Sequence, residues 1–186
     1  YGTSDLSTSV AIMSAATERL GEPPTLLLTS TSPPAALKAN GSELCQGNPD
    51  TCTLAKLADG RFDYAGFADH WRAVVEAYAA AGIEPDYISI QNDPEWVPPA
   101  EHETDACRFL ATEGTTTVTV DGNEVEVEYP GYRNALAAVK EALAELDSPP
   151  LTTGPDTRTV EGALSFADQD DPASVDVIAH HLYETE

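Results

Sequence analysis

Residues 87–96 decide the fold of this chain, and they run Tyr87-Ile88-Ser89-Ile90-Gln91-Asn92-Asp93-Pro94-Glu95-Trp96. The first half is a short, mostly apolar segment of the kind that forms a strand buried on both faces. The second half places an amide, two carboxylates, a proline and an indole in one loop. A buried strand that ends in such a loop is typical of parallel α/β proteins, in which functional groups gather where strands end.

Further strands are expected on both sides of this stretch. Leu26-Leu27-Leu28 form a continuous apolar run, which predicts another strand buried on both faces. Two more strands are expected at residues 151–153 and 175–183. Val118, Val120, Val125 and Val127 alternate with polar residues around an Asp121-Gly122-Asn123 turn, so residues 115–129 are expected to form a β-hairpin with one apolar face.

Three helices are expected between these strands. The first begins at the capping residue Asp5 and ends at Gly21. The second begins at the capping residue Asp63 and stops at Gly82, and the third follows Pro130. The apolar positions at helical spacing are Leu6, Val10, Met13 and Leu20 in the first, Phe67, Trp71, Val74, Val75 and Tyr78 in the second, and Tyr132, Leu136, Val139, Leu143 and Leu146 in the third.

The repeated strand–helix–strand order predicts an α/β fold with a parallel sheet and right-handed crossovers. No glycine-rich phosphate-binding motif follows a strand, which argues against a nucleotide-binding fold. The other common parallel fold is the (β/α)8 TIM barrel, which needs about 250 residues. This chain has 186 residues and roughly four βα units. We therefore expect residues 1–186 to be one partial barrel domain, with the hairpin inserted in a loop.

Charge excludes several classes of partner. The chain carries 32 acidic and 9 basic residues, a net charge of -23. Such a surface repels phosphates, so nucleic acids and anionic membranes are not expected partners. No apolar run approaches the roughly 20 residues that span a bilayer. A solvated acidic surface is the favoured interpretation, because the alternative of a cation site has no calcium-loop motif behind it.

The positions of the cysteines indicate in which compartment the protein is located. Cys45 and Cys52 flank a short segment rich in turn residues, and a disulfide between them would indicate an extracellular, secreted protein whose signal peptide lies outside this chain. A zinc site is the competing interpretation, but no Cys-x-x-Cys or paired histidine accompanies them. Cys107 is left over. No metal or organic cofactor is expected.

Candidate functional residues follow from the carboxyl ends of the predicted strands. They lie in residues 29–32, 91–96, 154–156 and 181–183. Asp93 is the main candidate, because a carboxylic acid held near apolar groups has a raised pKa and serves as a general acid in glycosidic bond cleavage. Trp96 is expected to stack on a sugar ring. The competing interpretation is a turn in which Asp93 only hydrogen-bonds backbone before Pro94.

These segments resemble glycoside hydrolase family 30, the glucosylceramidase and glucuronoxylanase group. Residues 87–96 resemble the signature of that family's fourth strand, which usually runs Ser-Ile-Gln-Asn-Glu-Pro. Ser32-Pro33-Pro34-Ala35, with Lys38 and Asn40-Gly41 behind it, is similar to the segment after strand three. Gly154-Pro155-Asp156 and His181-Leu182-Tyr183 are similar to the segments after strands five and six. The chain would then run from the second helix to the sixth strand of the barrel.

The resemblance implies a retaining glycoside hydrolase that acts on a β-linked polysaccharide such as xylan or β-glucan. Asp93 matches the general acid/base, and Asn92 matches the residue that bonds the sugar 2-hydroxyl and steadies the nucleophile. Tyr183 matches a residue near that nucleophile. The residues expected to line the cleft or contact substrate are Ser30, Glu95, Trp96, Asp156, His181 and Tyr183. For His181, a buried structural role is the alternative.

Three departures from the family pattern matter. The acid/base is normally Glu, and Asp93 is one methylene shorter. Thr31 and Ala36 stand where family members often carry tryptophans. The family's nucleophile is a Glu at the end of strand seven, so it is expected outside this chain, and neither Glu184 nor Glu186 is assigned to that role. A carbohydrate-binding pseudoenzyme or an inactive fragment is therefore the alternative function.

Overall fold

A four-stranded parallel sheet is the centre of the molecule. The structure, a computed structural model, describes residues 6–45, 47–99, 101–120, 122–167 and 175–183. In spatial order the strands are β1 (Leu27–Thr29), β2 (Tyr87–Ser89), β5 (Leu151–Thr157) and β6 (Val177–His180). All neighbouring pairs are parallel, and the register places Thr29, Ser89 and Thr153 side by side. The predicted α/β class and parallel sheet are confirmed.

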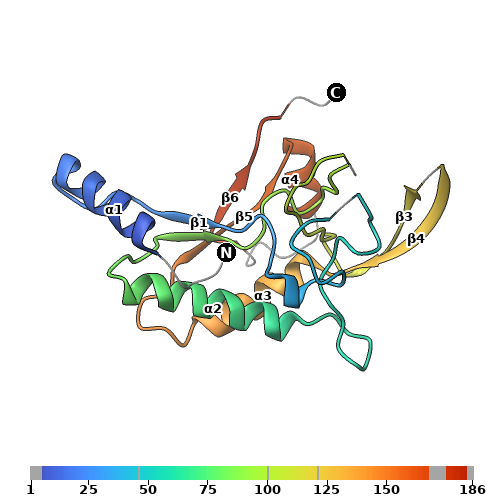
Figure 1. Ribbon diagram of the computed structural model, residues 1–186, viewed down its shortest axis with the longest axis horizontal. Coiled ribbons are helices and arrows are strands. Elements are labelled where there is room, and N and C mark those ends of the chain that lie inside the picture. Colours follow the sequence, from blue (N-terminus) through green and yellow to red (C-terminus); the bar gives the residue numbers. More distant parts are fainter. Residues whose placement is uncertain (1–5, 46, 100, 121, 168–174, 184–186) are drawn as a thin grey trace.

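Two helices lie side by side and cover one face of this sheet (Figure 1). They are α2 (Tyr64–Ala80) and α3 (Tyr132–Leu143). Asp63 caps α2 as predicted, since its side chain accepts a hydrogen bond of 2.8 Å from the Gly66 amide. The predicted apolar stripes meet the sheet in a core whose fully buried members include Phe67, Ile88, Ile90, Phe109, Leu136 and Val139. Trp71 is buried in this core, as expected.

The first strand differs from its prediction. β1 begins one residue later than expected, and Leu27 is 48% exposed while Leu28 packs against the core. β1 lies at an edge of the described sheet, and the helices that cover it lie on one side. An apolar run of three residues therefore indicated a strand correctly but overstated its burial.

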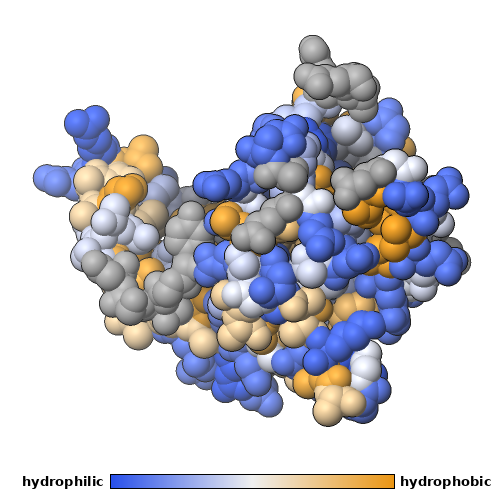
Figure 2. All heavy atoms as spheres, turned by 45° about the vertical axis from the view of Figure 1, so that its right-hand side comes forward, coloured by the Kyte–Doolittle hydropathy of each residue, from blue (hydrophilic) through white to orange (hydrophobic). Residues whose placement is uncertain are grey.

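The first helix, α1 (Ser7–Leu20), projects from the body of the molecule (Figure 1). It has no buried residue, and hydrophobic surface is visible on the lobe where it lies (Figure 2). Gly21 ends it in the left-handed conformation at φ 81°, as predicted. Its N-cap is Leu6, which makes no capping bond through its side chain, and the predicted cap Asp5 lies outside the described residues.

The last part of the chain also departs from the predicted bounds. The strand expected at residues 151–153 extends to Thr157, and the strand expected at residues 175–183 is reduced to Val177–His180. Between them lies a helix that was not predicted, α4 (Val160–Ala167). Its eight residues cover barely two turns, which is too short for a helical period to stand out in the sequence. No described helix combines the length and the apolar character needed to cross a bilayer.

The hairpin is present as predicted. β3 (Gly114–Val120) and β4 (Asn123–Tyr129) pair in antiparallel register, with Val118 opposite Val125. The alternate residues on one face are partly or fully buried, while the threonines and glutamates between them are exposed. The hairpin forms a separate two-stranded sheet that extends from the body (Figure 1).

The long loop between β1 and α2 is held by a disulfide and a buried lysine. The predicted Cys45–Cys52 disulfide is present in this loop, which also contains the short 3-10 helix η1 (Ala35–Leu37). Lys38 is 3% exposed, and its ammonium group donates hydrogen bonds to the Ser32 hydroxyl and to the carbonyls of Glu43 and Ala106. Burial lowers the pKa of Lys38. These bonds tie the loop to residues 104–109, which follow the loop that carries Asp93.

Candidate active site

The polar residues that follow the strands meet at the carboxyl edge of the sheet. The Asn92 amide donates a hydrogen bond of 2.7 Å to the Ser30 carbonyl, and the Asp93 amide donates one of 3.0 Å to the Asp156 carbonyl. These bonds join the loop after β2 to the loops that end β1 and β5. Three segments that lie 60 or more residues apart in the sequence are thereby fixed at one place.

Asp93 occupies a strained and buried position in this site. Its backbone is left-handed at φ 47°, and the residue is 8% exposed. The side-chain oxygen Oδ1 is buried without a hydrogen-bond partner and lies 3.7 Å from Nε2 of His181. Burial raises the pKa of Asp93. The neighbouring His181 and Arg158 oppose this effect, and the nearby carboxylates Glu95 and Asp156 add to it. Asp93 is therefore held protonated to a higher pH than an ordinary aspartate.

Asp156 is a carboxylate in a different environment. Its Oδ2 accepts hydrogen bonds from the hydroxyls of Ser89 at 2.9 Å and Thr29 at 3.5 Å, and its Oδ1 lies 3.4 Å from Nε2 of His181. The backbone reaches it through Gly154, where any Cβ would collide with the hydroxyl of Tyr132. Strands β1 and β2 thus supply donors that hold Asp156, whereas the Oδ1 atom of Asp93 has none.

His181 links the two aspartates to Asn92. Its Nε2 lies 3.0 Å from the side-chain oxygen of Asn92, 3.4 Å from Oδ1 of Asp156 and 3.7 Å from Oδ1 of Asp93. The side-chain oxygen of Asn92 is an acceptor, so Nε2 carries the proton and donates it to Asn92. The side-chain oxygen of Asn92 is occupied by this bond. The side-chain nitrogen Nδ2 of Asn92 is therefore the group that remains to donate to a ligand.

Two of the predicted substrate contacts are engaged within the protein. Glu95 accepts a hydrogen bond of 2.8 Å from the Arg158 amide through Oε1, so it fixes the turn after β5. The guanidinium of Arg158 lies 4.8 Å from the centre of the Trp96 ring. One face of Trp96, which was expected to stack on sugar, is therefore covered by a cation.

The other two predicted contacts are Tyr183 and Ser30. Tyr183 is 48% exposed, and its ring stacks on His181 with centroids 4.7 Å apart at an interplanar angle of 11°. Ser30 is partly buried, and its hydroxyl donates to the Ser32 carbonyl at 3.0 Å. The predicted site residues thus lie at or just beyond the carboxyl ends of the strands, and His181 contacts four of them: Asn92, Asp93, Asp156 and Tyr183.

Sequence reasoning missed two residues of this site, Ser89 and Arg158, whereas Thr29 lies in the predicted candidate segment 29–32. Ser89 was recoverable, because residues two apart on a strand share a face and Ser89 precedes Gln91 by two. Thr29 occupies the equivalent place on β1 by register. Arg158 had no signal of its own, since its contacts depend on how three loops fold together.

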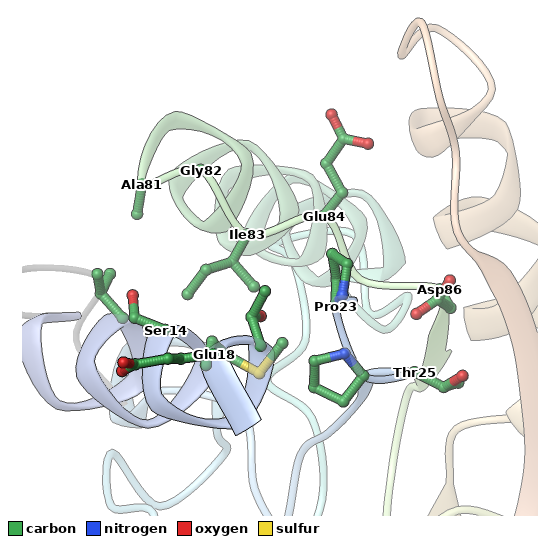
Figure 3. Close-up of a pocket in the computed structure, with 13 residues that line it drawn as sticks. Ser14, Glu18, Pro23, Thr25, Ala81, Gly82, Ile83, Glu84 and Asp86 are labelled. Atoms are coloured by element: carbon green, nitrogen blue, oxygen red, sulfur yellow. The ribbon is translucent and has the colours of Figure 1, made fainter. Parts of the chain in front are cut away.

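One hollow of the surface lies away from this site (Figure 3). It is formed by α1, the Pro23-Pro24 segment and the turn after α2, and Glu18, Ile83 and Asp86 are among its lining residues. Thr25 and Asp86 precede β1 and β2, so this hollow sits at the amino ends of those strands. It therefore belongs to the edge of the sheet opposite the Asp93 cluster.

The fold is shared with enzymes of glycoside hydrolase family 30. The subfamily 8 xylanase Xyn30A from Clostridium acetobutylicum superposes with a TM-score of 0.62 at 21% identity, covering 98% of this chain and 40% of that one. The catalytic domain of xylanase C from Talaromyces cellulolyticus gives 0.67 at 14% identity, covering 96% and 37%. A conserved exported protein from Bacteroides fragilis gives 0.58 at 14% identity, covering 94% and 30%.

These likenesses fix the fold as a partial glycoside hydrolase family 30-like domain. The chain spans 30 to 40% of the length of these solved structures. At 14 to 21% identity, these structural similarities establish the fold alone, and any catalytic chemistry must be argued from the residues of the site. No protein-family model matches the sequence, and no curated protein sequence matches it.

Proposed function

We propose that this chain contributes the acid/base half of a retaining β-glycoside hydrolase site. The observation that carries the proposal is the contrast between two carboxyls at the carboxyl edge of a parallel sheet. Asp156 accepts hydrogen bonds from two hydroxyls, while Asp93 is buried, and its Oδ1 lacks a partner. Burial raises the pKa of Asp93, and a carboxyl with a raised pKa is suited to act as a general acid.

In this mechanism Asp93 protonates the leaving glycosidic oxygen and then, as a carboxylate, takes a proton from the attacking water. The amide nitrogen of Asn92, oriented by His181, donates to the sugar 2-hydroxyl. The nucleophile is a carboxylate from residues outside this chain. Glu184 and Glu186, which were not assigned to that role, lie outside the described residues.

The proposed substrate is a β-linked polysaccharide of the xylan or β-glucan class. It is supported by the fold, whose solved neighbours include xylanases. The charge of -23 favours neutral polysaccharides over uronate-bearing ones. The Cys45–Cys52 disulfide supports an extracellular location.

A panel of xylans, β-glucans and aryl β-glycosides tests the proposal with the full-length protein. We expect hydrolysis of at least one β-linked substrate, with the β-anomer of the sugar released first, as followed by proton NMR. Release of the α-anomer would contradict the double-displacement mechanism.

The alternative function is a carbohydrate-binding pseudoenzyme, and the shorter side chain of Asp93 is the observation that favours it. Binding of a β-glucan or xylan with no turnover, unchanged by Asp93→Asn, would establish the pseudoenzyme instead.

The raised pKa of Asp93 predicts how the stability of the protein depends on pH. Its pKa is raised by folding, so its contribution to stability is full below the unfolded-state pKa of about 3.9 and is lost as the pH rises through the folded-state pKa. Asp93→Asn removes this titration, and asparagine tolerates the left-handed backbone at this position. We expect the variant to gain stability relative to the wild type as the pH rises from 3 to 7, as measured by urea unfolding. A difference that is constant across this range would contradict the raised pKa.

A further inference from the structure

A series of contacts between planar groups, here called the stack, joins the candidate acid/base site to Trp96, Arg158 and Tyr183. The guanidinium of Arg158 lies 4.8 Å from the centre of the Trp96 ring and 5.5 Å from the centre of the Tyr183 ring. The Tyr183 ring in turn stacks on His181 at 4.7 Å and 11°. The stack therefore starts at Trp96, on the loop after β2, and ends at His181, which bonds Asn92 on that same loop.

We propose that Arg158 is a positioning residue of this site. Its guanidinium holds the Tyr183 ring flat against His181, and His181 thereby keeps the side-chain amide of Asn92 turned so that Nδ2 points to a ligand. The inference rests on the proposed function. It assigns Arg158 a role through its neighbours, with no contact to the substrate required. Arg158 suits this role because a guanidinium is planar and stacks on aromatic faces, which a lysine ammonium does not do.

The backbone around Arg158 is fixed independently of its side chain. Its amide donates to Glu95 at 2.8 Å, and its carbonyl accepts from the Tyr183 amide at 3.1 Å. The His181 amide donates to the Thr157 carbonyl at 2.7 Å. Truncating the side chain leaves these bonds in place, so the segment that carries His181 stays near Asn92. What the guanidinium adds is control over the planes of the Tyr183 and His181 rings.

The orientation of the His181 ring matters because Nε2 lies near three side-chain oxygens, two on the loop after β2 and one on β5. It lies 3.0 Å from the Asn92 oxygen, 3.4 Å from Asp156 and 3.7 Å from Asp93. A small rotation of the ring exchanges the Asn92 bond for one of the carboxylates. Asn92 would then be free to turn, and its amide nitrogen would no longer be directed at a ligand. A misplacement of about 1 Å at a reacting group costs about 100-fold in rate.

The experiment compares Arg158→Met with the wild type in the full-length protein. We expect kcat on the best substrate of the panel to fall about 10- to 100-fold, with KM changed less than twofold. The His181 ring-proton resonances, assigned with His181→Gln, should move downfield, because the ring current of the stacked Tyr183 is lost. Arg61→Met removes the same charge from an exposed pair with Asp59 and should leave both readouts unchanged.

Arg158→Lys separates charge from stacking, and we expect it to retain most of the loss in kcat. Full recovery by lysine would overturn the stacking argument in favour of a simple charge effect. A rise in KM with unchanged kcat would overturn it in favour of a substrate contact. Unshifted His181 resonances in a folded Arg158→Met protein would overturn the stack itself. A wild-type protein without hydrolytic activity would contradict the proposed function and the catalytic part of this inference. The His181 resonances would still show whether the stack orders the His181 ring.

Discussion

Asp93→Asn is expected to lower kcat on unactivated β-linked substrates by about 10² to 10⁴. The variant cannot protonate the departing oxygen, and it cannot remove a proton from water in the second step. Asparagine has nearly the same shape and accepts the φ of 47° found at this position, so the loss reports chemistry and leaves the fold intact. Steady-state kinetics on the best substrate of the panel measure it.

The leaving group provides the sharpest control for this prediction. An aryl glycoside with a very acidic phenol needs no protonation to depart, so the first step of the Asp93→Asn reaction should remain fast and produce a burst of phenol. Asp59→Asn changes an exposed carboxylate that pairs with Arg61, and it should behave as the wild type. Equal losses for activated and unactivated substrates would show that Asp93 is not the general acid.

Leu136→Ala is expected to destabilise the protein by about 2 to 5 kcal/mol. Leu136 lies on α3, is fully buried, and packs in the core between α2, α3 and the sheet. The substitution removes apolar contact area and leaves a cavity that the tightly packed core cannot fill by relaxing. Urea unfolding with a shared m-value gives the difference in the free energy of unfolding.

Leu20→Ala is the matched control for this second prediction. Leu20 is also a helical leucine, but it is 63% exposed at the end of α1. Its replacement should change the free energy of unfolding by no more than about 0.5 kcal/mol. Similar effects of the two substitutions would mean that the α2–α3 core does not hold the fold together.

Local sequence patterns predicted those helices and strands whose caps and apolar spacing are pronounced. Asp63 and the spacing of Phe67, Trp71 and Val75 predicted α2, because a cap and an apolar stripe depend on neighbours in the sequence. The alternating valines predicted the hairpin for the same reason. The exposure of Leu27 escaped prediction, because burial depends on what other parts of the chain cover a strand.

The sequence by itself determined the parallel α/β architecture, the Cys45–Cys52 pair and the loops that carry candidate groups. Each of these features follows from the spacing of residues close together in the sequence. The carboxyl ends of parallel strands lie at one edge of the sheet, so the loops that follow them come together there. Only the tertiary structure decided how the surroundings of Asp93 and Asp156 differ: Asp93 is buried with Oδ1 unpartnered, whereas Asp156 accepts hydrogen bonds from two hydroxyls. Burial raises the pKa of Asp93, and burial depends on what distant parts of the chain cover a residue. The groups around Asp156 likewise come from β1, β2 and the segment after β6, which lie far apart in the sequence.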